Sequence, residues 1–381
     1  MIDTIGLIFG LFLNPLAENI LVPLDHSDPQ SRKISITYHF ENEFDPDRET
    51  VFTLDDPIDD AFQKFELGES VKAELNWVRI SGRHFSEDLQ NFINENANQD
   101  WEKIYRWLNQ NQVSQDIELI RRKLLGQKKV SLLGYSSSNG ILLHYLSGYS
   151  QSVEKLLCIN PFLMDIQTNL SFWNFSNYFQ NKSTELTNAE FFEFAYQSSV
   201  DYFNSDPSLR DSLINSAMKV FKESPSKSAK IYFPVSFAVR SFEHSIELMT
   251  EAKTDFPIAN FLKEKSDGLW MAYFKEKFPL IGTNYDVGLS FTGQVIILGS
   301  AYDLLINPKV VDVLAEFFPK STLVLFRDGH SLEKVRDAKE FYILLLAFLK
   351  NDFHQKVRSY QILNDLNLLF LGKNYNSIRI N

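Results

Sequence analysis

Short apolar runs bounded by polar turns recur along much of the chain, and each has the length of a β-strand. Residues 33–40 alternate apolar with polar positions, a pattern typical of a strand with one buried face. The runs at 130–133, 153–159 and 294–299 are largely apolar, which predicts strands buried inside a sheet. Further strands are predicted at residues 49–54 and 321–326, and residues 76–86 predict a short apolar strand that runs into a polar loop.

Helical patterns separate several of these strands. Residues 112–126 form an amphipathic pattern that is acidic early, basic late and closed by Gly126, as expected of a helix. An apolar helix is predicted after the strand at 130–133, and another, at residues 341–349, is apolar enough to cover a sheet. This alternation of strand and helix predicts an α/β fold with a mostly parallel, doubly wound sheet.

The rhythm changes between residues 162 and 292. This stretch is rich in Phe, Asn, Ser and Lys, has helical periodicity and contains no alternating strand pattern. Because it lies between two predicted sheet strands, it predicts an inserted helical cap whose aromatic residues form its core rather than a cofactor site. The chain then divides into an apolar N-terminal segment (1–18), a first part of the α/β core (19–161), the cap (162–292) and a second part of the core (293–381).

The composition limits the classes of partner. The 381 residues are 44% hydrophobic and 23% charged, which is enough for one large globular domain with an insertion. A formal net charge of −11 and the lack of a basic stripe argue against a nucleic-acid partner. The one cysteine, Cys158, lies in an apolar run, so it is predicted to be a buried core residue, and alone it forms no internal disulfide or cysteine-rich metal site.

The N-terminal segment leaves the compartment open. Residues 5–17 form an apolar run that is too short to span a bilayer and is interrupted by Asn14 and Pro15. The run has the length of a signal-peptide core with a small-residue cleavage point at Ala17, yet residues 1–4 contain no Lys or Arg. Export and a cytoplasmic location are therefore both compatible with the sequence. No other segment approaches membrane length, so no membrane span is predicted.

The stretch most suggestive of chemistry is a tight turn of a predicted strand into a helix. Gly134 and Ser138 flank Ser136 two residues away on each side, and small residues there let the chain turn sharply at an active serine. The helix N-terminus would offer N–H groups, that of Ser137 among them, to a developing oxyanion. Ser138 is the alternative nucleophile, although the strand would then have to run two residues further. A serine-rich loop without chemistry is the remaining interpretation.

Two later loops carry the residues that such a serine needs. Asp303 follows the strand at 294–299, and Gly329-His330-Ser331 follows the last predicted strand. The chain order Ser136, Asp303, His330, with each residue at a strand end, predicts a serine–aspartate–histidine triad. Asp328 is too close in sequence to His330 to be the preferred orienting acid. A triad of this kind requires no metal and no organic cofactor.

Several of these features resemble the proline iminopeptidase and tripeptidyl aminopeptidase family of α/β-hydrolases. They are Val22-Pro23-Leu24-Asp25 before a short Asp-Pro turn, the order of helix, glycine, strand and Ser136, and the Gly329-His330-Ser331 loop. The resemblance implies an α/β-hydrolase fold with an inserted helical cap. It also implies a serine peptidase that releases residues from the N-termini of small peptides.

The resemblance further implies residues that bind the substrate. After the strand at 49–54 the family has a glycine loop whose backbone N–H helps form the oxyanion hole, and the backbone N–H of Asp56 takes that place here. The carboxylate of Asp55 is then available for a substrate's ammonium group. Glu243 lies in a segment similar to the family's Cys-x-Glu, with Ser241 at the cysteine position, and would face the same amine; a solvated helix glutamate is the alternative.

Two other functions remain open. The same triad serves an esterase or another acyl hydrolase, because a fold does not determine its chemistry. Aspartates in place of the glycine loop, and Ser138 where the family has glycine, instead fit a binding protein that keeps the hydrolase scaffold. A small peptide or an ester is the expected substrate in the catalytic cases.

Overall fold

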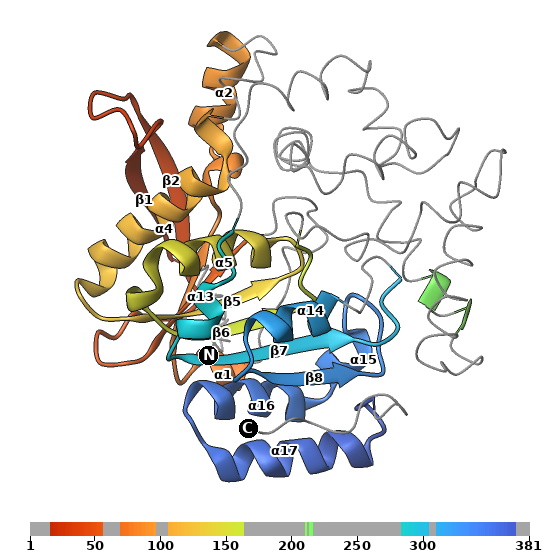
Figure 1. Cartoon of the computed structure of the whole chain (residues 1–381). Coiled ribbons are helices and arrows are strands. Elements are labelled where there is room, and N and C mark those ends of the chain that lie inside the picture. The colour runs from red at the N-terminus through yellow and green to blue at the C-terminus, as the bar shows by residue number, and fades with distance from the viewer. Residues whose placement is uncertain are drawn as a thin grey trace, which may run out of the picture.

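The computed structural model describes residues 16–55, 69–96, 106–163, 210–211, 213–215, 283–304 and 310–370. Within this part of the chain an 8-stranded sheet has the order β1-β2-β4-β3-β5-β6-β7-β8 (Figure 1). The strands are β1 (Leu16–Pro23), β2 (Lys33–Phe40), β3 (Thr50–Leu54), β4 (Asn76–Ile80), β5 (Val130–Tyr135), β6 (Val153–Ile159), β7 (Gln294–Ser300) and β8 (Thr322–Phe326).

The sheet is mostly parallel. β1 pairs antiparallel with β2, and β2 antiparallel with β4, whereas every pair from β4 across to β8 is parallel. β6 and β7 are direct neighbours although the whole segment 162–292 lies between them in sequence. The predicted α/β class with a mostly parallel, doubly wound sheet is therefore confirmed.

Helices cover both faces of this sheet (Figure 1). Apolar residues of α4, α5 and α14 pack on one face, and those of α1, α15, α16 and α17 pack on the other. None of the helices described here has the length and apolar character needed to cross a bilayer. The helices are α1 (Glu69–Lys72), η2 (Arg83–Phe85), α2 (Glu87–Asn96), α4 (Gln110–Leu125), α5 (Ser138–Tyr149), η3 (Ser150–Ser152), α13 (Val287–Ser290), α14 (Val310–Phe317), α15 (Glu333–Asp337), α16 (Lys339–Leu349) and α17 (Phe353–Asp365).

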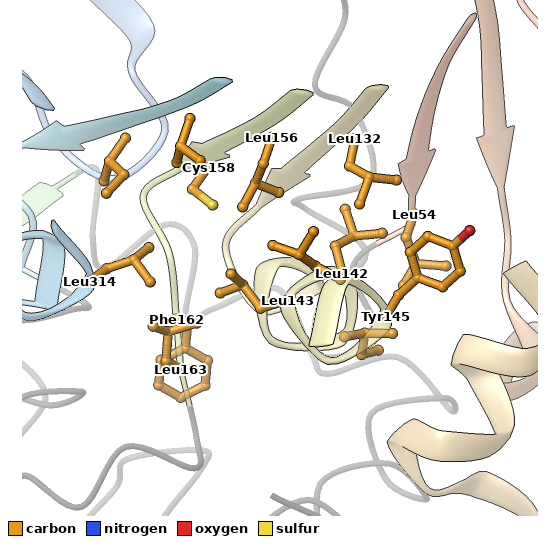
Figure 2. Packing of buried hydrophobic residues seen from close by; sticks show 14 of the residues in the cluster. Leu54, Leu132, Leu142, Leu143, Tyr145, Leu156, Cys158, Phe162, Leu163 and Leu314 are labelled. Atoms are coloured by element: carbon orange, nitrogen blue, oxygen red, sulfur yellow. The ribbon is translucent and has the colours of Figure 1, made fainter. Parts of the chain in front are cut away.

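Residues 156–159 of the inner strand β6 are continuously apolar because helices cover both faces of the sheet there. Leu156 and Cys158 pack toward α5 (Figure 2), whereas Leu157 and Ile159 belong to the core cluster on the opposite face. Successive side chains of a strand point to opposite faces, so a strand covered by helices on both sides has no polar position in its centre. Cys158 is fully buried, as predicted, and this burial raises the pKa of its thiol.

Most strand boundaries agree with the sequence pattern, and the differences have physical causes. β2 and β6 have the predicted bounds, whereas β5 runs to Tyr135 instead of ending at Leu133, because its pairing with β6 continues up to Tyr135 and Ile159. β1 begins at Leu16, within the segment expected to be a separate N-terminal region, since it pairs with β2 along its whole length. α4 begins two residues earlier than predicted, at Gln110.

A buried arginine joins the first strands to α4. Arg83, in η2 after β4, is fully buried and donates two hydrogen bonds of 2.7 Å to the carboxylate of Asp116. It also donates to the carbonyl oxygens of Leu24 and Trp107. His26 Nε2 lies 2.7 Å from the same carboxylate. The guanidinium of Arg83 and the carboxylate of Asp116 are thus paired with each other and further hydrogen-bonded. A buried ion pair is stable only under these conditions.

A second buried carboxylate, on α4, makes stability depend on pH. Burial raises the pKa of Glu118, but hydrogen bonds from Arg121, Arg122 and Tyr145 outweigh burial and lower it to about 2. A carboxyl group with a depressed folded-state pKa adds stability that is complete above its ordinary pKa of 4.5 and is lost as the pH falls toward 2. We expect Glu118→Gln to lower the free energy of unfolding at pH 7 by about 2 kcal/mol, with the difference from wild type shrinking between pH 5 and pH 2.

Urea unfolding of both proteins across this pH range checks that expectation. Glu154 provides the control, because its ion pair with Lys129 is 3.7 Å long and about half exposed on both sides. Exposed pairs of this kind contribute about 0–1 kcal/mol, so Glu154→Gln is expected to unfold almost as the wild type does. A Glu118→Gln deficit that persisted unchanged at pH 2 would contradict the assignment.

Candidate active site

Ser136 occupies a tight turn between β5 and α5. Its φ of 51° lies in the left-handed region, which is costly for a residue other than glycine. The backbone around it is well held: its N–H donates to the carbonyl of Ile159 at 3.0 Å, and its carbonyl accepts from the N–H of Phe162 at 3.0 Å and from Asn139 Nδ2 at 2.9 Å. Hydrogen bonds to β6 and α5 thus maintain a strained serine at the carboxyl end of the sheet.

The glycine two residues earlier is required by the close approach of strand and helix. A Cβ atom added at Gly134 would lie 2.4 Å from Asn139 Oδ1 and 3.0 Å from Asn139 Cα. A side chain here would therefore displace the Asn139 amide, which is held by hydrogen bonds to the carbonyls of Ser136 and Ile159, and would crowd the backbone of α5. The small residue expected from the sequence is therefore a packing requirement of the turn.

The neighbouring serines have different positions in the same turn. The Ser138 hydroxyl donates to the carbonyl of Tyr135 at 2.7 Å and accepts from the N–H of Tyr135 at 2.9 Å. It therefore closes the turn, whereas Ser136 lies at its apex. Ser137 precedes α5 as its N-cap residue, so its N–H belongs to the positive end of the helix dipole.

Asp303 and His330 meet although they come from different strands. Asp303 follows β7 and His330 follows β8; the distance between His330 Nδ1 and Asp303 Oδ2 is 2.6 Å, and both side chains are buried. Backbone hydrogen bonds join the two loops, from Ala301 N–H to Phe326 O at 2.8 Å and from Tyr302 N–H to Asp328 O at 3.2 Å. An imidazole held by a carboxylate at one nitrogen has a defined orientation, and with Nδ1 as the donor its Nε2 is a base.

Asp328 has a structural task in the histidine loop. Its carboxylate accepts from the N–H of Gly329 at 2.8 Å and from the N–H of Val335, in α15, at 3.0 Å. Burial raises the pKa of Asp328, and these two N–H donors lower it only in part. The side chain therefore shapes the loop, while Asp303 is the acid that contacts the imidazole.

Tyr135 brings the histidine loop to the serine turn. Its hydroxyl donates to the carbonyl of His330 at 2.7 Å, and its ring centroid lies 5.6 Å from that of the imidazole. Tyr135 immediately precedes Ser136, so this contact links the histidine loop to the strand that ends at the serine turn. The turn after β5 and the loops after β7 and β8 thus meet at one end of the sheet, which is where ligands bind in open α/β sheets.

Comparisons with known proteins are remote. No family model matches the sequence, and no curated protein matches it. Among solved structures, a probable hydrolytic enzyme from Pseudomonas aeruginosa PAO1 is 14% identical, with a TM-score of 0.46 over 88% of this chain and 94% of that one. A serine hydrolase from Cycloclasticus zankles is 14% identical, with a TM-score of 0.43 over 88% of this chain and 99% of that one. An enol-lactonase from Burkholderia xenovorans LB400 is 11% identical, with a TM-score of 0.43 over 83% of this chain and 97% of that one.

The strand order and the serine turn identify the architecture. The sheet has an antiparallel start, a parallel remainder and a sharp strand–serine–helix turn after β5. The chain has the α/β-hydrolase fold. Of the cap expected in this fold, the structure describes residues 162–163, 210–211, 213–215 and 283–292. Among these, Leu213 is buried, and a Cβ atom at Gly329 would lie 3.4 Å from its Cδ2, so this residue lies against the histidine loop.

The remaining residues predicted for the site are located as follows. Asp55 comes directly after β3, where its Oδ1 lies 3.4 Å from Arg79 Nε, so its carboxylate faces a cation of the protein. Asp56 and Glu243, expected from the sequence as an oxyanion donor and a substrate ligand, lie outside the described residues. Within the described part of the hydrolase fold, no three His, Cys, Asp or Glu side chains are grouped so as to hold a metal ion.

Three polar residues that hydrogen-bond Ser136 or His330 were not predicted from the sequence. Asn139 holds the carbonyl of Ser136, and Asn160 and Tyr135 both bind the carbonyl of His330. Asn160 follows the buried strand β6 directly, and a polar residue at the carboxyl end of such a strand is a signal that was available from the sequence. Asn139 and Tyr135 carried no comparable signal, because their roles depend on which loops are neighbours.

Proposed function

We propose that this protein is a serine hydrolase in which Ser136 is the nucleophile, His330 the general base and Asp303 the orienting acid. The observation that supports this most strongly is the buried 2.6 Å contact between His330 Nδ1 and Asp303 Oδ2, in a loop that is hydrogen-bonded to Tyr135, the residue before the strained Ser136. A strained backbone and a buried histidine–carboxylate pair each lower the stability of the folded protein. Both are accounted for if they form a catalytic site together.

The proposed mechanism has two steps. Ser136 Oγ attacks the carbonyl carbon of the substrate while His330 Nε2 accepts its proton, and Asp303 stabilises the resulting imidazolium. The proton then passes to the leaving group as the acyl–enzyme forms, and water attacks the acyl group with His330 as base again. The N–H of Ser137, at the N-terminus of α5, is the first proposed donor to the oxyanion, and the backbone of Asp56 is the second.

The substrate is an acyl compound, and two classes remain candidates. The resemblance to proline iminopeptidases supports a peptidase that removes residues from peptide N-termini. The contact between Asp55 and Arg79 favours the second candidate, an esterase or other acyl hydrolase, because a carboxylate already facing a guanidinium is a weak ligand for a substrate's ammonium group. Hydrolysis of aminoacyl and peptidyl coumarins, compared with that of p-nitrophenyl esters, distinguishes the two.

Labelling with a fluorophosphonate probe tests the proposal directly. We expect the probe to label the wild type and not Ser136→Ala, because only an activated serine displaces its fluoride. Ser138→Ala is the matched control: it changes a serine of the same turn whose hydroxyl bonds only backbone atoms in the structure, so it is expected to remain labelled. A folded wild type that resists the probe would favour the binding-protein interpretation and reject the proposed hydrolase.

A further inference from the structure

The backbone carbonyl of His330 is held by two side chains from other strands. Tyr135 Oη, from β5, donates to it at 2.7 Å, and Asn160 Nδ2, after β6, donates to it at 2.6 Å. Both donors are buried, with 7% of Tyr135 and 3% of Asn160 exposed. Hydrogen bonds away from water are expensive to leave unmade, so these two contacts constrain the histidine loop strongly.

Asn160 is suited to this place by both its backbone and its amide. Its φ of 42° lies in the left-handed region, which asparagine tolerates better than most other residues. The two hydrogens of Nδ2 allow it to donate to Ser300 Oγ, at 2.9 Å, as well as to the His330 carbonyl, while its own N–H donates to Leu298 O at 2.8 Å. One residue thereby connects the ends of β6 and β7 to the loop after β8.

Tyr135 makes the complementary connection. It immediately precedes Ser136, so its side chain is anchored to the residue that carries the proposed nucleophile. Its hydroxyl binds the carbonyl of His330, and its ring lies beside the imidazole at a tilt of 54°. A shift of the histidine loop relative to the serine turn would therefore stretch this hydrogen bond and that of Asn160 together.

We propose that Asn160 and Tyr135 are positioning residues that fix the backbone of His330 and so align its imidazole between Asp303 and Ser136. This inference rests on the proposed function, which assigns His330 as the base. Both act through the hydrogen bonds that hold this carbonyl, with the Tyr135 ring also lying beside the imidazole. Alignment matters because displacing a catalytic group by about 1 Å costs about 100-fold in rate.

Two conservative variants test the inference. Tyr135→Phe removes only the hydroxyl, and Asn160→Gly removes the amide while tolerating the positive φ. Each is expected to lower kcat by about 10-fold to 100-fold with little change in KM, because the substrate contacts remain. The rate of fluorophosphonate labelling should fall in parallel. In the double variant the losses should be less than multiplicative, since both donors hold the same carbonyl.

The chain offers a matched control for each variant. Tyr360, on α17, is as buried as Tyr135, at 7% exposed, and Tyr360→Phe removes its hydroxyl outside the proposed site. Asn351, between α16 and α17, has a φ of 59°, so Asn351→Gly reproduces the backbone change of Asn160→Gly. Both controls are expected to keep the wild-type kcat.

The NMR signal of the His330 Nδ1 proton separates this inference from the proposed function. Assigned by its loss in His330→Ala, this signal is expected to be sharp and downfield in the wild type and to exchange faster with water in Tyr135→Phe and Asn160→Gly, without any substrate. Unchanged exchange together with unchanged kcat in both folded variants would overturn the positioning role even in a working hydrolase. Faster exchange in a protein that the fluorophosphonate does not label would support the positioning role while rejecting the proposed activity.

Discussion

Replacing His330 with alanine is expected to lower kcat by about 10⁴-fold or more while the protein remains folded. The imidazole is the proposed base for Ser136, and its ring is held by Asp303 at 2.6 Å and lies beside Tyr135. Without it the serine hydroxyl keeps its ordinary high pKa and is a poor nucleophile. Steady-state kinetics on the best ester or peptide substrate measures the loss, and fluorophosphonate labelling should slow with it.

His26 provides a matched control for this variant. Its Nε2 lies 2.7 Å from the carboxylate of Asp116, so it too is a histidine paired with a buried aspartate, but it lies in the turn after β1. His26→Ala is expected to lower the free energy of unfolding by about 1 kcal/mol and to leave kcat within a small factor of the wild type. An equal loss of kcat in both histidine variants, or retained turnover in His330→Ala, would refute the assignment of the base.

Asp303→Asn is expected to lower kcat by about 10⁴-fold with a small change in KM. The carboxylate accepts a hydrogen bond from the Nδ1–H of His330, whereas an amide nitrogen at the same place would donate to Nδ1 and so favour the tautomer that carries its proton on Nε2. That tautomer is unable to accept the proton of Ser136. The ratio of kcat to KM for wild type and variant, measured at neutral pH, reports this loss.

Asp328→Asn is the control for the aspartate variant. Asp328 lies two residues before His330, yet its carboxylate accepts from the backbone N–H groups of Gly329 and Val335. An asparagine oxygen preserves one of these bonds, so Asp328→Asn should lower the melting temperature while retaining most of kcat. A larger loss in Asp328→Asn than in Asp303→Asn would reverse the roles of the two aspartates.

The strained backbone of Ser136 is held in place by several hydrogen bonds. A serine at φ 51° lies in an unfavourable conformation, which four backbone and side-chain hydrogen bonds to Ile159, Phe162 and Asn139 hold in place. The buried sheet around it, with apolar residues on both faces of β5 and β6, supplies the rigidity that such a turn needs. The hydrogen bonds and the packing of the surrounding sheet thus offset the conformational cost of this buried turn.

Much of the fold could be predicted from the sequence because it depends on local periodicity. Strand β6 is largely apolar because helices cover both faces of the sheet, and β2 alternates because one of its faces is more exposed. Both strands have the predicted bounds. The predicted end of β5, Leu133, was two residues too early, because the pairing with β6 rather than the local pattern determines where that strand ends. The residues Ser136, Asp303 and His330 were proposed from the sequence because each follows a recognisable strand.

The amino-acid sequence by itself determined the α/β class, the buried strands and the positions of three candidate site residues at strand ends, because these follow from hydrophobic period and turn chemistry between near neighbours. Only the tertiary structure decided that Asp303 rather than Asp328 contacts His330, that Asp55 faces Arg79, and that Tyr135 and Asn160 share one carbonyl. These contacts join residues that are far apart in sequence or depend on how two loops approach each other. Such contacts depend on how the strands of the whole sheet pack together, so they cannot be predicted from a local sequence pattern.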